Sequence, residues 1–164
     1  MNKALIVFYS FSGNTQKVAD ALKQELSASY EVNMQRLEAV DESASFFGQC
    51  VRAFMKKEAG IKEENISFDV SGFDLVVLGT PVWAFGMAPA MRTYISKCRG
   101  ISGKKVIIFS TYGSGAGKDK CVREMASLLE KKGAAKINSL LIQQANVNNR
   151  QLVSEQLGKA LQNG

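Results

Sequence analysis

The sequence contains no histidine, and this absence narrows the chemistry that the chain can perform. Without an imidazole there is no His ligand for a metal or a haem, and no His general base. The three cysteines, Cys50, Cys98 and Cys121, lie far apart without a Cys-x-x-Cys pair, so we expect no zinc or iron–sulfur site. This odd, sparse set also argues against a secreted disulfide framework and predicts a cytoplasmic location. Any chemistry must therefore come from hydroxyls, backbone amides, aromatic rings or a bound cofactor.

Long hydrophobic runs are also missing. No apolar stretch approaches the roughly 20 residues that cross a bilayer, and the run 4–9 after Lys3 is too short for the core of a signal peptide. The 164 residues are 46% hydrophobic and 22% charged, a composition typical of globular proteins. We therefore expect residues 1–164 to form a single domain with no membrane partner.

The net charge of +6 is unevenly distributed along the chain. Residues 1–82 carry 8 Lys and Arg against 11 Asp and Glu, whereas residues 83–164 carry 13 against 4. Such charge usually faces water, but a basic surface also suits an acidic protein partner or a phosphate-bearing substrate. Because no basic helix interleaved with aromatic residues is present, we do not expect nucleic acid as a partner.

Continuous apolar runs alternate with amphipathic segments along the chain. Residues 4–9, 75–78 and 106–109 are apolar on both faces, which is typical of central strands in a parallel sheet covered on both sides by helices. The more polar segments 32–37 and 137–142 predict edge strands. Together they predict a doubly wound α/β three-layer sandwich with a five-stranded parallel sheet in the order 2-1-3-4-5. Ligands bind such sheets beyond the carboxyl ends of the first and third strands.

The connection between the second and third predicted strands, residues 38–73, is longer than this fold requires. Its residues 46–57 carry an apolar stripe at helical spacing that includes Phe46, Phe47 and Phe54. We expect this helix to cover the sheet. A partner surface or a homodimer through the 46–57 helix is the alternative.

The segment after the first strand is a candidate phosphate site. It contains Ser10, Ser12, Gly13, Asn14 and Thr15 and leads directly into a predicted helix. Free N–H groups at a helix N-terminus bind phosphate, and hydroxyls with one glycine complete the cradle. A simple helix cap is the alternative, but a cap requires one such side chain rather than a series of them.

Two further loops follow the third and fourth predicted strands. They contribute Thr80, Pro81, Val82, Trp83, Ala84, Phe85 and Gly86, and Thr111, Tyr112, Gly113, Ser114 and Gly115. Their aromatic rings either pack beneath the loops or form walls for a flat ligand. A phosphate cradle beside such walls favours a ligand with one phosphate and one planar ring system, and flavin mononucleotide (FMN) matches this better than an adenine or guanine mononucleotide.

Other phosphate-binding motifs do not fit. The segment from Gly113 to Lys118 is one residue too short for a P-loop, and Asp119 stands where the hydroxyl should be. The loop after the first strand has a single glycine instead of a dinucleotide fingerprint. A phospho-receiver domain needs acidic residues at the strand ends, and here the first strand ends in Tyr9 and Ser10.

With these motifs the sequence resembles the flavodoxin family, the FMN-binding electron carriers, over essentially the whole chain. The strongest match is Ser10-x-Ser12-Gly13-Asn14-Thr15, which is similar to the family's phosphate loop. The resemblance implies that Trp83 and Tyr112 stack on the isoalloxazine ring, with Phe85 as a substitute. It also implies that the backbone of residues 82–85 contacts the pyrimidine or N5 edge.

The resemblance implies electron transfer through FMN to or from a redox partner protein. An NAD(P)H-dependent FMN or quinone reductase on the same fold is the nearest alternative, because a basic surface attracts the phosphates of a nicotinamide nucleotide. A non-redox binding module without functional flavin, acting through the 46–57 helix, is a second alternative. Arg92, Lys118 and Lys120 are expected near the ring loops, where their charge would make the flavin potential less negative than in an acidic flavodoxin.

Overall fold

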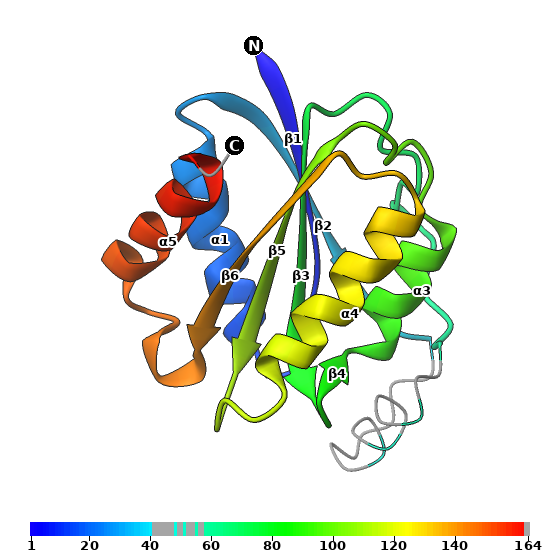
Figure 1. Ribbon diagram of the computed structural model, residues 1–164, viewed down its shortest axis with the longest axis vertical. Coiled ribbons are helices and arrows are strands. Elements are labelled where there is room, and N and C mark those ends of the chain that lie inside the picture. The colour runs from blue at the N-terminus through cyan, green and yellow to red at the C-terminus, as the bar shows by residue number, and fades with distance from the viewer. Residues whose placement is uncertain (41–47, 49–50, 52–54, 56–57, 163–164) are drawn as a thin grey trace.

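A computed structural model describes residues 1–40, 48, 51, 55 and 58–162 (Figure 1). Most of the predicted helix 46–57 lies outside the described residues. Its packing on the sheet and its use as a dimer surface therefore stay predictions.

Five parallel strands form the sheet. They are β1 (Asn2–Tyr9), β2 (Tyr30–Leu37), β3 (Leu75–Trp83), β5 (Lys105–Tyr112) and β6 (Lys136–Gln143). Their spatial order is β2-β1-β3-β5-β6, with every neighbouring pair parallel. The predicted fold class and strand order are thus confirmed. A two-residue strand, β4 (Gly86–Met87), pairs antiparallel with the end of β3 and was not predicted.

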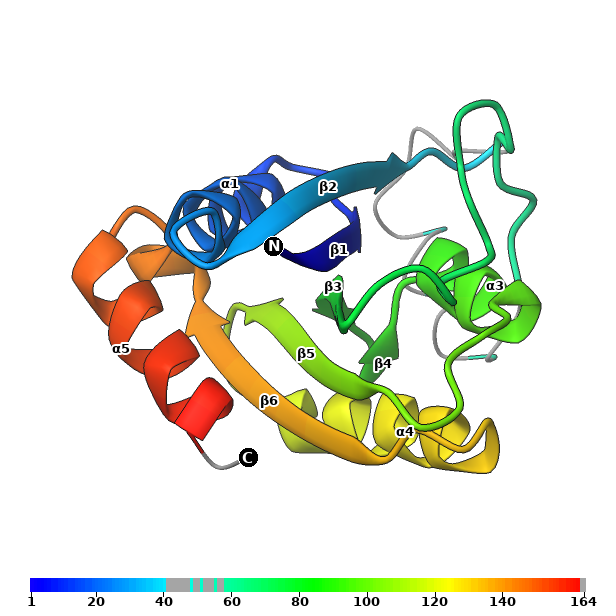
Figure 2. The ribbon, with the colours of Figure 1, turned by 90° about the horizontal axis from the view of Figure 1, so that it is seen from above.

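Helices cover both faces of this sheet. The helices α1 (Asn14–Leu26) and α5 (Arg150–Gln162) lie on one face, and α3 (Pro89–Lys97) and α4 (Lys118–Lys131) lie on the other (Figures 1 and 2). A short 3-10 helix, η1 (Gln144–Asn146), connects β6 to α5. Pro89 stands in the first turn of α3, as predicted from helix punctuation.

The alternation of side chains along β1 explains why two helical layers form. Leu5, Val7 and Tyr9 pack into the apolar cluster shared with α3 and α4. The intervening residues Ala4, Ile6 and Phe8 pack into the cluster shared with α1 and α5. Because successive side chains of a strand point to opposite faces, a continuous apolar run stabilises packing on both sides of the sheet.

The strands β3 and β5 extend further than their apolar runs predict. The segments 79–83 and 110–112 were expected as loops, but they continue the ladder, with Thr80 opposite Ser110 and Pro81 opposite Thr111. Hydroxyl side chains are buried there, since Thr80, Ser110 and Thr111 have no exposed area. The strands consequently end at Trp83 and Tyr112 rather than at the ends of the apolar runs.

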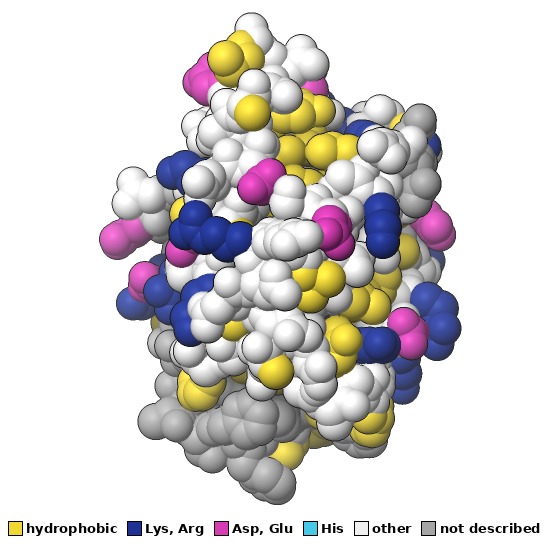
Figure 3. Space-filling view, turned by 90° about the vertical axis from the view of Figure 1, so that its left-hand side faces the viewer, with side chains coloured by type: hydrophobic (Ala, Val, Ile, Leu, Met, Phe, Trp, Pro, Cys, Tyr) yellow, Lys and Arg dark blue, Asp and Glu magenta, His cyan; other side chains and the backbone are white. Residues whose placement is uncertain are grey.

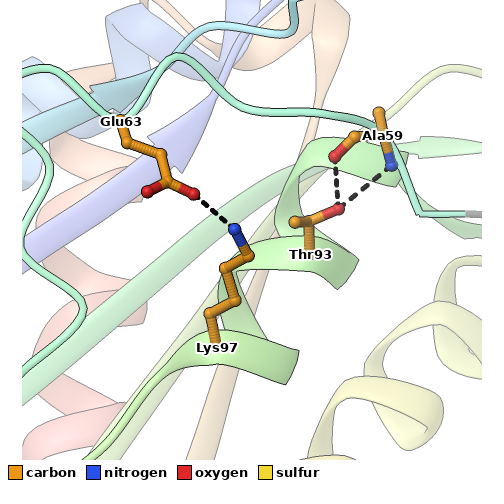
Figure 4. A network of polar contacts seen from close by, with 4 residues as sticks. All are labelled: Ala59, Glu63, Thr93 and Lys97. Atoms are coloured by element: carbon orange, nitrogen blue, oxygen red, sulfur yellow. Dashed lines mark hydrogen bonds and ion pairs between the residues drawn. The ribbon is translucent and has the colours of Figure 1, made fainter.

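The segment 59–63 is joined to α3 by polar contacts (Figure 4). The Ala59 N–H donates a hydrogen bond of 3.0 Å to Thr93 Oγ1, and this hydroxyl donates one of 2.6 Å to the Ala59 carbonyl. One turn further along α3, Lys97 pairs with Glu63. These contacts fix the end of the long connection against the α3 side of the sheet.

The surface over α5 and α1 carries charges of both signs, with Lys and Arg interspersed among Asp and Glu (Figure 3). No single sign dominates this face. Among the helices in the described part of the chain, none is both long enough and apolar enough to cross a membrane.

Candidate functional site

The carboxyl ends of β1, β3 and β5 lie together at one edge of the sheet, at the bottom of Figure 1. The first turns of α1 and α4 and the strand β4 lie at the same edge. All three loops that the sequence singled out are therefore brought together, as the strand order requires.

The segment from Ser10 to Thr15 presents the N-terminus of α1. Gly13 is the N-cap residue of α1, with a φ of 87°, and as a glycine it offers no side chain to cap the helix. A Cβ atom placed on Gly13 would meet nothing within 4 Å, so the space in front of the helix is open. Ser10 is buried, and its Oγ accepts a hydrogen bond of 3.2 Å from the Gln16 N–H. Ser10 therefore caps one N–H group of the first turn, that of Gln16. The other N–H groups of this turn have no partner within the helix and are suited to binding an anion.

Thr15 links this cradle to the end of β5. Its side chain is buried, and its Oγ1 lies 2.9 Å from Thr111 Oγ1 in a hydrogen bond between the two hydroxyls. The Arg36 guanidinium on β2 donates a hydrogen bond of 3.2 Å to the Ser10 carbonyl, which adds a cation beside the loop. The geometry and charge of this segment therefore both favour a negatively charged group.

Two neighbouring cavities occupy the edge. The first, which we call the aromatic cavity, has a volume of about 330 Å³ and is lined by Val82, Trp83, Ala84, Phe85, Tyr112, Gly113, Ser114, Ala116 and Gln144. The second, the hydroxyl cavity, has a volume of about 230 Å³ and is lined by Phe11, Ser12, Thr15, Pro81, Trp83, Thr111 and Gln144. Trp83 and Gln144 line both cavities, so the two are adjacent and together form an elongated site.

The aromatic side chains differ in how firmly they are held. Trp83 is only 4% exposed and packs edge to face against Tyr9, with ring centroids 5.5 Å apart, and against Phe11, with centroids 5.7 Å apart. Phe85 is 48% exposed. Trp83 is thus a fixed wall between the cavities, whereas Phe85 presents a ring to solvent at the mouth of the aromatic cavity.

Tyr112 forms the wall contributed by β5, and a cation lies over it. The Lys118 ammonium is 4.7 Å from the centroid of the Tyr112 ring, within cation–π range. This confirms the expected position of Lys118 near the ring loops. Arg92 was expected there as well, but it lines neither cavity and instead pairs with Glu124 between α3 and α4.

The turn between β3 and β4 is a two-residue hairpin. Ala84 and Phe85 have φ angles of 44° and 67°, the left-handed values that such a turn needs at both central positions. The turn packs against Gly117, where an added Cβ would lie 2.4 Å from the Phe85 ring. Gly117 therefore allows the turn to approach the start of α4 closely.

The structure brings many of the predicted residues to the two cavities. Eight of them come from the ring loops, namely Pro81, Val82, Trp83, Ala84, Phe85, Tyr112, Gly113 and Ser114. Ser12, Thr15 and Thr111 supply hydroxyls. Six predicted residues line neither cavity: Ser10, Gly13, Asn14, Thr80, Gly86 and Gly115. Of these, Thr80 Oγ1 accepts a hydrogen bond from the Ala88 N–H and donates one to the Pro81 carbonyl, so it holds the start of α3.

Three residues that line the cavities were not predicted: Phe11, Ala116 and Gln144. Phe11 and Ala116 lie inside the predicted loops and could have been included by position. Gln144 directly follows β6, so the rule that sites lie beyond strand ends applies to it too. Gln144 was missed because the candidate loops were those after the first, third and fourth predicted strands, whereas β6 is the edge strand beyond them.

No Asp, Glu, His or Cys is found among the described residues that line the two cavities. Among the described residues, no group of three or more His, Cys, Asp or Glu side chains is placed to hold a metal. Burial raises the pKa of the Cys98 thiol to about 11 and that of the Cys121 thiol to about 12, and neither lines the site. An open cradle for an anion beside an aromatic cavity fits a ligand that has a phosphate at one end and a planar ring at the other.

The family model described as NADPH-dependent FMN reductase matches residues 5–147. Among solved structures, a flavoprotein in complex with FMN from Lactobacillus acidophilus NCFM is 20% identical, with a TM-score of 0.63, covering 92% of this chain and 99% of that chain.

Two further structures share the fold. An NADH:FMN oxidoreductase in its apo form is 14% identical with a TM-score of 0.69, covering 99% of this chain and 88% of that chain. The flavodoxin of Megasphaera elsdenii is 20% identical with a TM-score of 0.60, covering 96% of this chain and 99% of that chain. At these identities the likeness concerns the fold, which both reductases and electron carriers use.

Proposed function

The chain belongs to the NADPH-dependent FMN reductase family, and on this premise we propose that it is an FMN-dependent oxidoreductase that takes electrons from NAD(P)H. FMN is its cofactor and the flavodoxin-like sheet is its scaffold. The observation that carries the proposal is the pair of adjacent cavities at one sheet edge, one lined by hydroxyls at a helix N-terminus and one lined by aromatic rings.

The residues present fit FMN. Ser12, Thr15 and the first-turn amides of α1 would hold the phosphate, and the open space in front of Gly13 leaves room for it. Tyr112 with Trp83 or Phe85 would flank the ring. When bound, FMN supplies the redox chemistry, accepting a hydride equivalent from a nicotinamide and passing electrons to an acceptor.

The protein's own contribution is binding, orientation and electrostatics. Trp83 is fixed by Tyr9 and Phe11, so a ring bound against it would be held in one orientation. The Lys118 cation over Tyr112 favours negative charge in the aromatic cavity and would raise the reduction potential of a ring bound there. Phe85, a half-exposed lining residue of the aromatic cavity, would cover part of a ring bound there.

Electron transfer between proteins is the second candidate function. It is supported by the presence of all three flavodoxin-like loops and by the fold shared with the Megasphaera elsdenii flavodoxin over nearly the whole of both chains. The two functions differ in the source of electrons, which is NAD(P)H for a reductase and a redox partner protein for a carrier. We also propose a cytoplasmic location, which agrees with Cys98 and Cys121 being free thiols.

Anaerobic stopped-flow mixing separates these functions. The FMN-loaded protein is mixed with NADPH or NADH, and the visible absorbance of the flavin is followed. Rapid bleaching at a rate that saturates with nucleotide concentration is expected for the reductase. Bleaching by a reduced partner protein or by dithionite, with none by either nucleotide, would instead identify an electron carrier. A purified protein that stays colourless and takes up no added FMN would contradict both.

The phosphate contact is tested by comparing FMN with riboflavin, which lacks the phosphate. We expect Ser12→Ala combined with Thr15→Val to weaken FMN binding about tenfold or more while changing riboflavin binding little, because hydrogen bonds to a charged group are lost. Ser114→Ala, in the wall of the aromatic cavity, is the matched control and should affect both ligands equally. Equal losses in the double variant would mean that Ser12 and Thr15 do not contact the phosphate and that Thr15 acts only through its hydrogen bond to Thr111.

A further inference from the structure

A third cavity lies between α3 and α4, away from the flavin-binding edge. It has a volume of about 330 Å³ and is lined by Glu58, Arg92, Ile95, Ser96, Leu128, Lys131 and Lys132. None of these residues lines the aromatic or the hydroxyl cavity. Leu128 is ten residues beyond Lys118 on α4, which places it about 15 Å along the helix from the cation at the aromatic cavity. We call this third space the Arg92 cavity.

The side chain of Arg92 is buried with most of its hydrogen-bonding capacity unused. The residue is 9% exposed, and its Nη1 lies 3.1 Å from Glu124 Oε1. Its Nε and Nη2 are buried and have no hydrogen-bond partner. Leaving charged donors buried and unpaired is costly, so natural structures seldom keep them without a reason. Arg92 lines the cavity while these two donors are themselves covered, so an acceptor that enters there would pair with them once the guanidinium turns toward the cavity.

The other residues that line the cavity indicate what kind of molecule would carry this acceptor group. The lining carries three positive side chains, Arg92, Lys131 and Lys132, against one negative side chain, Glu58. Lys131 is exposed. Lys132 donates hydrogen bonds of 2.9 and 3.0 Å to the carbonyls of Ser96 and Cys98, so its ammonium holds the end of α3. Ile95 and Leu128 make part of the wall apolar.

Hydrogen bonds to α3 hold the segment that contributes Glu58 to the cavity. Glu58 precedes Ala59, whose N–H and carbonyl both bond Thr93 Oγ1 on α3, the residue next to Arg92 (Figure 4). The cavity is thus bounded by two helices and an anchored segment, and its volume lies within the range of sites for small molecules. A concave site of this size suits a small ligand better than the flat surface of a protein partner.

We propose that the Arg92 cavity binds a small organic anion, with its carboxylate or phosphate oxygens on the Arg92 guanidinium and its apolar part against Ile95 and Leu128. Arg92 matches two oxygens of one oxyanion through its planar fork, which a lysine cannot do. Lys131 attracts the anion from the rim. The site is separate from that of FMN and would be occupied at the same time.

Isothermal titration calorimetry on the FMN-loaded protein tests this, because FMN keeps the cradle at α1 from binding the added anion. The probes are benzoate, phenyl phosphate and inorganic phosphate. We expect one benzoate or phenyl phosphate per chain, with inorganic phosphate at least several-fold weaker because it lacks the apolar part. Equal affinity for inorganic phosphate, or binding of an acidic peptide with none of the small anions, would overturn the proposal.

Substitutions of lining residues test whether the anion binds in the Arg92 cavity. Arg92→Lys keeps the charge and should weaken benzoate binding about tenfold or more, since the two-point contact is lost. Lys131→Gln changes an exposed side chain, leaves the fold intact and should weaken binding several-fold. Lys23→Gln on α1, the matched control on the other face of the sheet, should have no effect. Unchanged affinity in both Arg92→Lys and Lys131→Gln would overturn the assignment even if benzoate binds elsewhere.

Discussion

Cys98 and Cys121 show how burial controls a single side chain. Loss of hydration raises the pKa of Cys98 to about 11 and that of Cys121 to about 12, from an ordinary value of 9.0. Both thiols therefore stay protonated and unreactive in the native protein near neutral pH. In a Cys50→Ser variant at pH 8 we expect no alkylation by iodoacetamide over the time in which the urea-unfolded chain reacts fully, as measured by mass spectrometry.

The same shifts link stability to pH. An unfolded thiol ionises near pH 9 while the folded one keeps its proton, so the unfolded state is favoured as the pH rises above about 9. The contribution of these thiols to stability is complete below that pH and decreases through the range up to about 12. Alkylation of the native variant at pH 8 would show that the thiols are accessible and would contradict this account.

Gly79 is the residue with the least room for a side chain. It lies inside β3, and an added Cβ would stand 2.0 Å from the nearest atom of the Phe109 ring on the neighbouring strand. We expect Gly79→Ala to lower the free energy of unfolding by about 3 kcal/mol, because the ring and two buried strands must move apart. Equilibrium unfolding in urea measures this change in the free energy of unfolding. Gly72→Ala, where nothing lies within 4 Å, is the control and should change stability by less than about 0.5 kcal/mol.

At the scale of elements, α5 contains a glycine that weakens it. Gly158 lies in the interior of the helix, with open space where a Cβ would be. We expect Gly158→Ala to raise the free energy of unfolding by about 1 kcal/mol, because alanine loses less backbone entropy in a helix. Gly103 has equal space but a φ of 74°, so Gly103→Ala should instead destabilise by about 1 kcal/mol. Unfolding curves that shift in the same direction for both variants would contradict the role of the backbone angle.

The positions at which the strands end also show what the sequence can and cannot predict. Buried central strands were found because apolar runs such as residues 4–9 record burial on both faces. The extensions of β3 and β5 were missed because Thr80, Ser110 and Thr111 are polar, and only pairing with a distant strand reveals them. The same applies to Gln144, which reaches the site through the position of β6 in the sheet rather than through any local pattern.

At the scale of the whole molecule, the basic C-terminal half, residues 83–164, supplies all of the described lining of the aromatic cavity except Val82. Lys118 lies over Tyr112, and Lys120 follows on the first turn of α4. We expect Lys118→Gln combined with Lys120→Gln to lower the flavin reduction potential by tens of millivolts, because positive charge favours the reduced, more negative flavin. Redox titration at low salt measures the shift.

A matched variant and added salt test whether this effect is electrostatic. Lys23→Gln on α1 removes one remote charge and should leave the potential unchanged. The difference between the double variant and the unmodified protein should decrease as ionic strength rises, since exposed charges are screened. An identical potential in the double variant at low salt would show that these lysines do not act on the flavin.

Gln144 lines both cavities, and its place in the sequence determines when the binding site can be completed during synthesis of the chain. The site draws on residues near positions 12, 83, 112 and 144, which are far apart in the sequence. The strand β1 must also wait for β3, whose pairing begins at Leu75, before the centre of the sheet can form. A nascent chain therefore cannot present a complete binding site until β6 and Gln144 have been synthesised and paired with the sheet. Cofactor capture thus acts on the assembled sheet and stabilises it against reopening.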